Sequence, residues 1–457
     1  MKATYIIGAL FLFLLLPACN KNLNVQPQNS LTSGQIQTST DVEALLFGAY
    51  NQLQQPGNFG ESFLFAADLI AADSQVDFVG TFYDYSAVQN KTAVSTNSIA
   101  SNVWGTAYST IGLCNTVLDK IALVDSADRP TVLGEALFIR GTCFFYLTGF
   151  YGKPYSDGSA SGNLGIPLVL KPTYAYDSSN NGPDKPSRST VQQSYAQVVS
   201  DLQTAIANLP TSNVNFRADV YSAHAMLSRV YLSMGNYAGA AGEADTVLQS
   251  GNFALTGTFG KEFNNDGNST EDIFGIQQSA QSNAGTTNNG LPTFYSSYPV
   301  GRGDAQVDPL YTSIFDDPND FRSTFFTAGK SISGFTGNYT NKWELIYKTI
   351  PVIRLSEMYL TRGEANLLGG TSIGDLPVND INAVRSRSNA GPLSNPGQAD
   401  FIEERFRELA FEGDRYWTLK RSKLNITGLS YDDNKLILPI PQTEIDVNKN
   451  LVQNGGY

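Results

Sequence analysis

Apolar residues recur at intervals of three and four positions over long stretches of the chain, which is the spacing of one buried helix face. The first such stretch runs from Leu45 to Leu53. The same spacing predicts further helices at about 104–115, 132–151 and 191–209. The last of these is expected to stop before Pro210, because proline cannot continue a helix.

Residues 218–249 form the clearest repeated unit. An apolar stripe ending at Met234 is followed by the turn sequence Gly235-Asn236-Tyr237 and then by a second stripe rich in alanine. Two short helices with a glycine turn and small residues at their crossing resemble a tetratricopeptide repeat. A similar pair is expected at 352–368 and 378–388. The pattern therefore predicts an all-α fold of tetratricopeptide-like helix pairs.

Long stretches rich in glycine and asparagine separate the helical regions, at roughly 153–188, 251–304 and 327–342. Loops of this length are uncommon in a compact domain unless they carry function. Many aromatic residues lie in or beside them: Tyr174, Tyr176, Phe294, Tyr295, Tyr298, Phe335, Tyr339 and Trp343. A helical frame that carries irregular aromatic loops is typical of a binding surface.

The N-terminus indicates export. Lys2 precedes an apolar run from Tyr5 to Leu16, which is shorter than the roughly 20 residues that span a bilayer but fits a secretory signal peptide. The run ends in Leu16-Pro17-Ala18-Cys19, which resembles a bacterial lipobox. We expect a signal peptide at 1–18, with Cys19 lipidated as the first mature residue; an ordinary signal peptide with Cys19 as a bystander is the alternative. Acyl chains contribute about 0.8 kcal/mol per buried methylene, so several chains would anchor the protein firmly.

The polar segment 19–40 is expected to be a membrane tether, and 41–457 a ligand-binding domain with parts at about 41–250 and about 251–457. The formal net charge is −12, and it becomes −13 once Lys2 is removed with the signal peptide. An acidic surface repels phosphates, which argues against a nucleic-acid partner. Besides Cys19 the chain has only Cys114, Cys143 and His224 as thiol and imidazole groups, so no metal cluster of these ligands and no cofactor is expected. The sequence leaves open whether Cys114 and Cys143 form a disulfide.

Three acids near the C-terminus, Glu404, Glu408 and Glu412, are spaced four residues apart and are expected to share a helix face near Arg405 and Arg415. Paired carboxylates can serve as acid and base in glycoside hydrolysis. They can equally form ion pairs that lock a helix in place, which is the reading we favour, because charge networks are commonly structural. No catalytic residue is assigned.

An ordered set of motifs resembles the SusD/RagB family of Bacteroidetes outer-membrane lipoproteins, over essentially the whole mature chain. The set comprises Cys19 with Leu23–Pro27, Trp104–Asn115, Glu135–Arg140, Arg354–Leu360 with Glu364-Ala365, Asn382–Arg387, Glu404–Arg415, Leu419–Arg421, Leu438–Pro441 and Glu444–Asn454.

The resemblance implies a lipoprotein on the cell exterior that captures nutrient oligomers, most often glycans, and passes them to a SusC-like TonB-dependent transporter. Surface exposure is inferred from the family, because Asn20-Lys21-Asn22 follows the cysteine where this phylum often has acidic residues. The ligand-binding candidates carried over from the family's loop regions are Phe82, Tyr83, Tyr85, Tyr295, Tyr298 and Trp343, with Arg302 and Asp304 as polar partners. The expectation is a binding protein, not an enzyme. The alternatives are a surface glycoside hydrolase on a helical scaffold and a repeat scaffold that binds only protein.

Overall fold

The computed structural model describes residues 34, 36–72, 74–174, 185–214, 216–315 and 317–457. The chain divides into two compact units, Met1–Gln37 and Thr38–Tyr457. The division into a tether at 19–40 and a domain of two parts stays a prediction. The predicted signal peptide, Cys19 and Tyr176 lie outside the described residues. No helix among those described is both long enough and apolar enough to cross a membrane.

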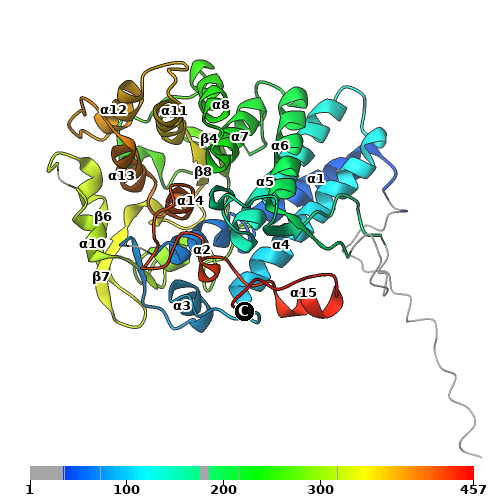
Figure 1. Cartoon of the computed structure of the whole chain (residues 1–457), viewed down its shortest axis with the longest axis horizontal. Coiled ribbons are helices and arrows are strands. Elements are labelled where there is room, and N and C mark those ends of the chain that lie inside the picture. The colour runs from blue at the N-terminus through cyan, green and yellow to red at the C-terminus, as the bar shows by residue number, and fades with distance from the viewer. Residues whose placement is uncertain (1–33, 35, 73, 175–184, 215, 316) are drawn as a thin grey trace, which may run out of the picture. The chain divides into compact units, whose positions relative to one another are not determined.

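The four helices predicted from apolar spacing are present (Figure 1). They are α1 (Ser39–Leu53), α4 (Ser98–Asp119), α5 (Arg129–Tyr151) and α6 (Val191–Asn208). Polar caps set where two of them begin, since Thr38 with Asp41 and Thr190 with Gln193 form capping boxes. α1 starts at Ser39, so the last two residues of the predicted tether belong to this helix.

Both predicted helix pairs are also present and lie side by side in Figure 1. They are α7 (Val220–Met234) with α8 (Tyr237–Gln249), and α11 (Leu355–Gly369) with α12 (Pro377–Arg387). Gly235 turns the chain between α7 and α8 with φ of 74°, a left-handed conformation that favours glycine. At Gly239 a Cβ atom would lie 2.8 Å from the Tyr231 ring, so the missing side chain lets the two helices approach closely. The tetratricopeptide-like helical fold is confirmed.

Shorter elements complete the second unit. The remaining helices are α2 (Ser62–Ile70), α3 (Tyr83–Gln89), α9 (Leu291–Tyr295), α10 (Pro309–Thr312), α13 (Gln398–Leu409), α14 (Asp414–Arg421) and α15 (Gln442–Val447). Short 3-10 turns are η1 (Ile121–Leu123), η2 (Tyr155–Asp157), η3 (Phe259–Glu262), η4 (Phe321–Thr324), η5 (Asn341–Trp343) and η6 (Asn434–Leu436).

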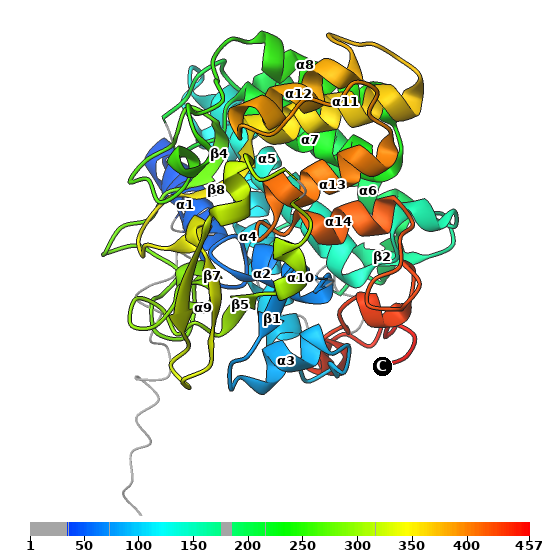
Figure 2. The same cartoon turned by 90° about the vertical axis from the view of Figure 1, so that its left-hand side faces the viewer.

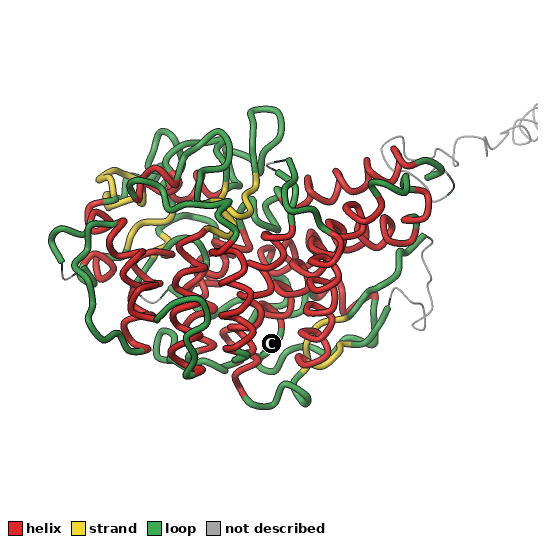
Figure 3. The backbone as a smooth tube through the Cα atoms, turned by 90° about the horizontal axis from the view of Figure 1, so that it is seen from above, coloured by secondary structure: helices red, strands yellow, loops and turns green. Residues whose placement is uncertain are grey.

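The structure also contains strands that the sequence reading missed, some within the predicted loop regions and others outside them. One of them covers Ile350–Arg354, so the second helix pair begins at Leu355 and not at the expected residue 352. The strands are β1 (Val76–Phe78), β2 (Leu164–Pro167), β3 (Arg188–Thr190), β4 (Asp272–Ile276), β5 (Ala305–Val307), β6 (Phe326–Lys330), β7 (Thr336–Thr340) and β8 (Ile350–Arg354). β1, β5, β7 and β6 form an antiparallel four-stranded sheet in that order, while β2–β3 and β4–β8 are separate pairs. Figure 3 shows many of the strands and loops along one side of the packed helices, with further strand segments on the opposite side.

Aromatic rings fill the core between α2, α5 and α14. The rings of Phe63 and Tyr146 stack with centroids 4.5 Å apart, and Phe59 meets both edge to face. Trp417 of α14 stacks on Phe145 of α5 at 4.8 Å. Cys114 and Cys143 are both buried and free. Helix α2 therefore packs against α5 and α14, which belong to the helical frame.

Candidate functional site

The segments predicted to carry ligand contacts meet around α2 and the four-stranded sheet. Figure 2 shows α3, β1, β5, β7 and α9 gathered in one region. β1 pairs with β5 in antiparallel register, with Phe78 opposite Ala305. This pairing brings the segment before α3 next to the segment around Arg302, although more than 200 residues separate them in the sequence.

Arg302 is the polar centre of this region. Its guanidinium carbon lies 4.7 Å above the centroid of the Phe82 ring, and its Nε donates to Oδ2 of Asp304 at 2.7 Å. Asp304 is fully buried, whereas 19% of the Arg302 side chain is exposed. Within the described part of the chain, neither Nη group of Arg302 donates a hydrogen bond to protein. The guanidinium is thus fixed by a carboxylate and a ring while two of its nitrogens stay available.

Glycine residues make this arrangement possible. Gly303 has φ of 64°, and a Cβ atom there would lie 3.0 Å from the Tyr339 side chain. A Cβ at Gly80 would lie 2.6 Å from the Asp304 side chain, so the chain after β1 can pass close to the buried carboxylate only without one. The backbone of Arg302 is fixed on both sides, because its N–H donates to Thr293 at 2.6 Å and its carbonyl accepts from Ile332 at 2.7 Å.

Exposed apolar groups lie on the same segments as Phe82 and Arg302. Tyr83, next to Phe82, is 73% exposed, and Tyr298 is 46% exposed. Tyr298 donates its backbone N–H to Lys330 of the β6–β7 hairpin. The turn of this hairpin adds Ile332 and Phe335, which are also exposed and were not among the predicted site residues. We call Phe82, Tyr83, Tyr298 and Arg302 the open surface.

The other four predicted contact residues are buried, so the structure does not support a direct ligand contact for them. The Tyr85 hydroxyl donates to Glu61 at 2.5 Å, and the Tyr295 hydroxyl donates to Asp68 at 2.7 Å. Trp343 donates its indole N–H to the Phe411 carbonyl at 2.8 Å, and Asp304 is covered as described above. The three rings and the Asp304 carboxylate are therefore interior groups of the domain.

Two residues that the sequence reading missed are Glu61, which immediately precedes α2, and Asp68 within α2. Burial raises the pKa of each carboxyl to about 7, against the lowering effect of the hydrogen bonds from Tyr85 and Tyr295 respectively. A signal for Asp68 exists in the sequence, since it is an acid inside the apolar run from Phe63 to Ile70. Such a residue needs internal partners in order to be buried.

The C-terminal acids form a structural ion-pair network. Arg322 contacts Glu404 at 2.7 Å and Glu408 at 3.0 Å, and Arg354 contacts Glu408 at 2.5 Å. Although burial opposes ionisation, the guanidinium groups of Arg387, Arg354 and Arg322 hold the pKa of Glu408 well below its usual value. A carboxyl with a lowered pKa cannot act as a general acid near neutral pH.

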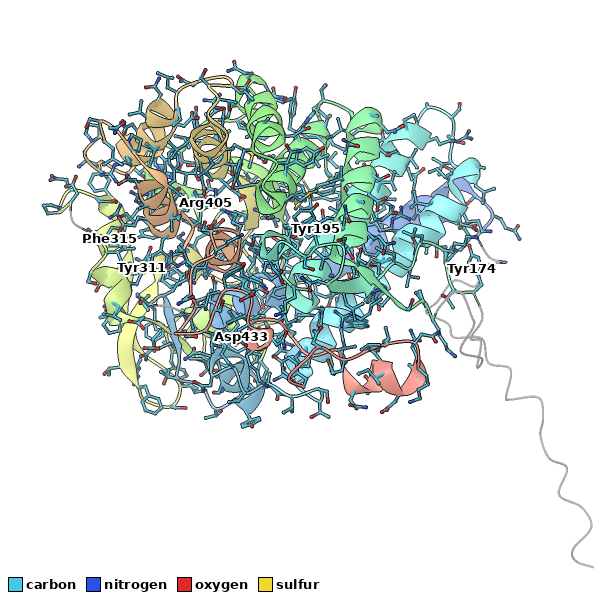
Figure 4. All side chains as sticks on the ribbon, viewed as in Figure 1. Tyr174, Tyr195, Tyr311, Phe315, Arg405 and Asp433 are labelled. Atoms are coloured by element: carbon cyan, nitrogen blue, oxygen red, sulfur yellow. The ribbon has the colours of Figure 1, made fainter. Side chains whose placement is uncertain are left out.

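The expectation of one shared helix face was wrong for Glu412, because α13 ends at Leu409. Glu412 nevertheless joins the network through Arg354 at 2.8 Å. Beside the network, Tyr311 and Phe315, labelled in Figure 4, lie edge to face with centroids 5.5 Å apart. Arg405, also labelled there, pairs with Asp414. The geometry therefore supports the structural reading of these charges.

The frame and the open surface define a class of helical repeat protein that carries an exposed, partly aromatic face built from loops. A family model described as "Starch-binding associating with outer membrane" matches residues 21–232, and a model of the SusD family matches 315–436. The chain belongs to the SusD/RagB family.

Known relatives agree with this assignment. A SusD-like protein P2 of Formosa agariphila is 26% identical, with 100% of this chain and 99% of the relative aligned. The starch-binding protein SusD of Bacteroides thetaiotaomicron is 34% identical over 36% of this chain and 30% of its own length. A crystal structure of a SusD superfamily protein from Bacteroides thetaiotaomicron superposes with a TM-score of 0.82 and 26% identity, covering 91% of this chain and 99% of that one.

Proposed function

We propose that this protein is a lipoprotein, anchored through Cys19 and facing the cell exterior, that captures glycans at the open surface. It then delivers them to a SusC-like TonB-dependent transporter in the outer membrane. The observation that carries the proposal is the Arg302 guanidinium, which Asp304 and Phe82 hold still beside exposed Tyr83 and Tyr298. Names of relatives that bind starch support glycan as the ligand class.

The chemistry of the open surface suits sugar rings. A sugar face that covers about 50 Å² of apolar area contributes on the order of 1 kcal/mol, at roughly 25 cal/mol per Å². Exposed Tyr83 and Tyr298 can each receive such a face, and the free Nη groups of Arg302 can donate to sugar hydroxyls. The resulting affinity is modest, which suits a protein that must release its cargo.

Binding is tested with purified residues 20–457 on a panel of neutral, uronic-acid-containing and sulfated polysaccharides, by affinity gel electrophoresis and calorimetry. Tyr298→Ala is expected to weaken binding of the retained polysaccharide several-fold without loss of stability, because the ring is 46% exposed. Phe47→Ala is the matched control, since Phe47 is also 46% exposed but lies on α1. Full affinity in Tyr298→Ala, or a loss in Phe47→Ala, would place the ligand elsewhere.

The same incubations test for enzymatic activity. A binding protein releases no new reducing ends from the polysaccharide that it retains, whereas a glycoside hydrolase does. If the purified protein releases new reducing ends from the polysaccharide, the hydrolase alternative replaces this proposal.

Anchoring and delivery require the native membrane. Wild type is expected to incorporate an alkyne-labelled fatty acid, to be cleaved by protease on intact cells, and to co-purify with a barrel transporter. Cys19→Ala is expected to lose the label and to leave the membrane fraction. Absence of the label from wild type would remove the anchor, and protection from protease would remove the surface location.

A further inference from the structure

Two carboxylates on α2 hold the segments that carry the open surface. Glu61, the residue before the first turn of α2, is 1% exposed. It accepts hydrogen bonds from the Tyr85 hydroxyl at 2.5 Å, the Gly290 N–H at 2.8 Å and the Ser62 hydroxyl at 3.2 Å. It therefore joins α3, which follows Phe82, to the start of α9.

Asp68 occupies the same helix two turns later and is fully buried. It accepts from the Tyr295 hydroxyl at 2.7 Å, the Gln75 side-chain amide at 2.6 Å and the Gly413 N–H at 3.0 Å. These contacts join the end of α9, the start of β1 and the start of α14. The short helix α9 is thus held at its two ends by two acids of one rigid helix.

The position of α9 determines that of the open surface. Tyr298 and Arg302 lie in the loop that follows α9, and Arg302 donates its backbone N–H to Thr293 inside that helix. Phe294 of α9 also stacks on Phe65 of α2, with centroids 5.0 Å apart. A shift of α9 therefore moves Arg302 relative to Phe82.

We infer that Glu61 and Asp68 are positioning residues of the open surface, and that their ionised forms hold α9 and α3 in the arrangement that binds ligand. The inference rests on the proposed function for its biological meaning, but the arrangement itself can be tested without a ligand.

The chemistry of these contacts gives the inference a pH dependence. The Gly290 N–H can only donate, so a proton on the Glu61 oxygen that faces it replaces an acceptor with a donor and breaks that hydrogen bond. A proton on the other oxygen removes the charge that strengthens the hydrogen bonds from the hydroxyls of Tyr85 and Ser62. Burial, the largest effect, raises the pKa of both carboxyls to about 7. Protonation in the range just below pH 7 therefore weakens the hold on α9.

Other titratable and charged groups lie near these carboxyls. Asp84 of α3 and Asp304, beside β5, act on the Tyr85 phenol that faces Glu61. Tyr295 faces Asp68, and Lys342 acts on it from η5. Lys342 also pairs with Glu412 at 2.5 Å, so its charge is shared between the two acids.

The free energy of global unfolding changes with the protonation of Glu61 and Asp68 in the direction opposite to that of the hydrogen bonds to α9. A carboxyl whose pKa is raised in the folded state is more easily protonated there than in the unfolded state. Its contribution to the free energy of unfolding therefore increases as pH falls from about 7 towards the ordinary pKa of a carboxyl. Lower pH thus weakens the hydrogen bonds to α9 while these groups favour the folded state as a whole. Both directions hold together when α9 moves and the carboxyls stay buried beside α2, because the lost hydrogen bonds had lowered their pKa, whereas global unfolding exposes the carboxyls to water. A purely structural role for the acids does not predict this combination.

Hydrogen–deuterium exchange of the full mature protein, without ligand, tests the inference. At pH 8, Glu61→Gln and Asp68→Asn are expected to speed exchange in residues 285–303 by about tenfold, the effect of losing one hydrogen bond to a charged group. Asp380→Asn is the matched control: this carboxyl is also buried but pairs with Arg362 on α11. The control is expected to leave exchange in 285–303 unchanged.

The pH profile provides a second readout that needs no variant. In wild type, exchange in 285–303, corrected for its intrinsic pH dependence, is expected to accelerate between pH 8 and 6 relative to α8. The Glu61→Gln, Asp68→Asn double variant is expected to have lost this dependence. A flat wild-type profile, or variants that match wild type at pH 8, would overturn the inference. Because no glycan is present, either result is independent of whether glycan binding itself is found.

Discussion

The pair formed by Arg302 and Asp304 allows stability and ligand binding to be separated. Arg302→Met keeps an unbranched apolar stem against Phe82 but removes the charge. It leaves the fully buried Asp304 carboxylate without its 2.7 Å partner. Breaking a buried ion pair costs roughly 3–5 kcal/mol, and because 19% of Arg302 is exposed we expect about 3 kcal/mol.

The second replacement, Asp304→Asn, removes the unpaired charge. We therefore expect the double variant, Arg302→Met with Asp304→Asn, to recover most of the lost free energy of unfolding, measured by urea titration. It should not recover ligand affinity, because both variants lack the Nη donors; the affinity is expected to fall by at least about tenfold. Two results would refute the reasoning: a double variant as unstable as the single one, or a double variant that binds polysaccharide like wild type.

Three further outcomes follow from the packing. Gly149→Ala is expected to lower the free energy of unfolding by about 1–3 kcal/mol, because its Cβ would lie 1.8 Å from Trp417. Gly105→Ala should raise it by about 0.5–1 kcal/mol, because within the described part of the chain no atom outside its own helix backbone would lie within 4 Å of the new Cβ. Equal changes in the free energy of unfolding of the two variants, measured by urea titration, would contradict this packing argument. Burial lowers the pKa of Lys420 to about 7, so its cost to stability is greatest at and below that pH and fades towards its ordinary pKa of 10.5. Lys420→Met should therefore stabilise the protein more at pH 7 than at pH 10, and the opposite trend in paired urea titrations would refute this. Arg387→Met should destabilise the protein strongly without changing the pH profile of exchange in 285–303, because it pairs with Glu271 and Glu408 and not with α2.

The helical frame was predictable because each helix needs only a local pattern. α7 and α8 follow from apolar spacing and one glycine turn, and capping residues mark helix starts. The four-stranded sheet was missed because its strands are short and their partners are remote. β1 is three residues long and pairs with β5 more than 200 positions later, so neither segment shows a period of its own.

The candidate site was predictable as a region but not residue by residue. Tyr83 and Tyr85 are both tyrosines and lie two positions apart on α3, yet Tyr83 is 73% exposed and Tyr85 is only 7% exposed. Which of them is buried depends on where Glu61 and Phe294 lie, and that is set by tertiary contacts. Arg302 and Asp304 were both named as polar partners, but only the fold shows that the acid supports the arginine and does not reach the surface.

The residues that identify the family and the residues that form the open surface are different sets with different constraints. Arg354, Glu408 and Arg405 belong to the recognisable C-terminal motifs and are all buried in ion pairs. Removing one partner of such a pair leaves an uncompensated buried charge, so these positions tolerate little change. Among the described residues, Tyr83 and Tyr298 have no such ion-pair partners, and they lie on segments that the frame only positions. Under the proposed function, substitution there changes which glycan is held while the fold stays intact, so the motifs identify the frame and not the ligand.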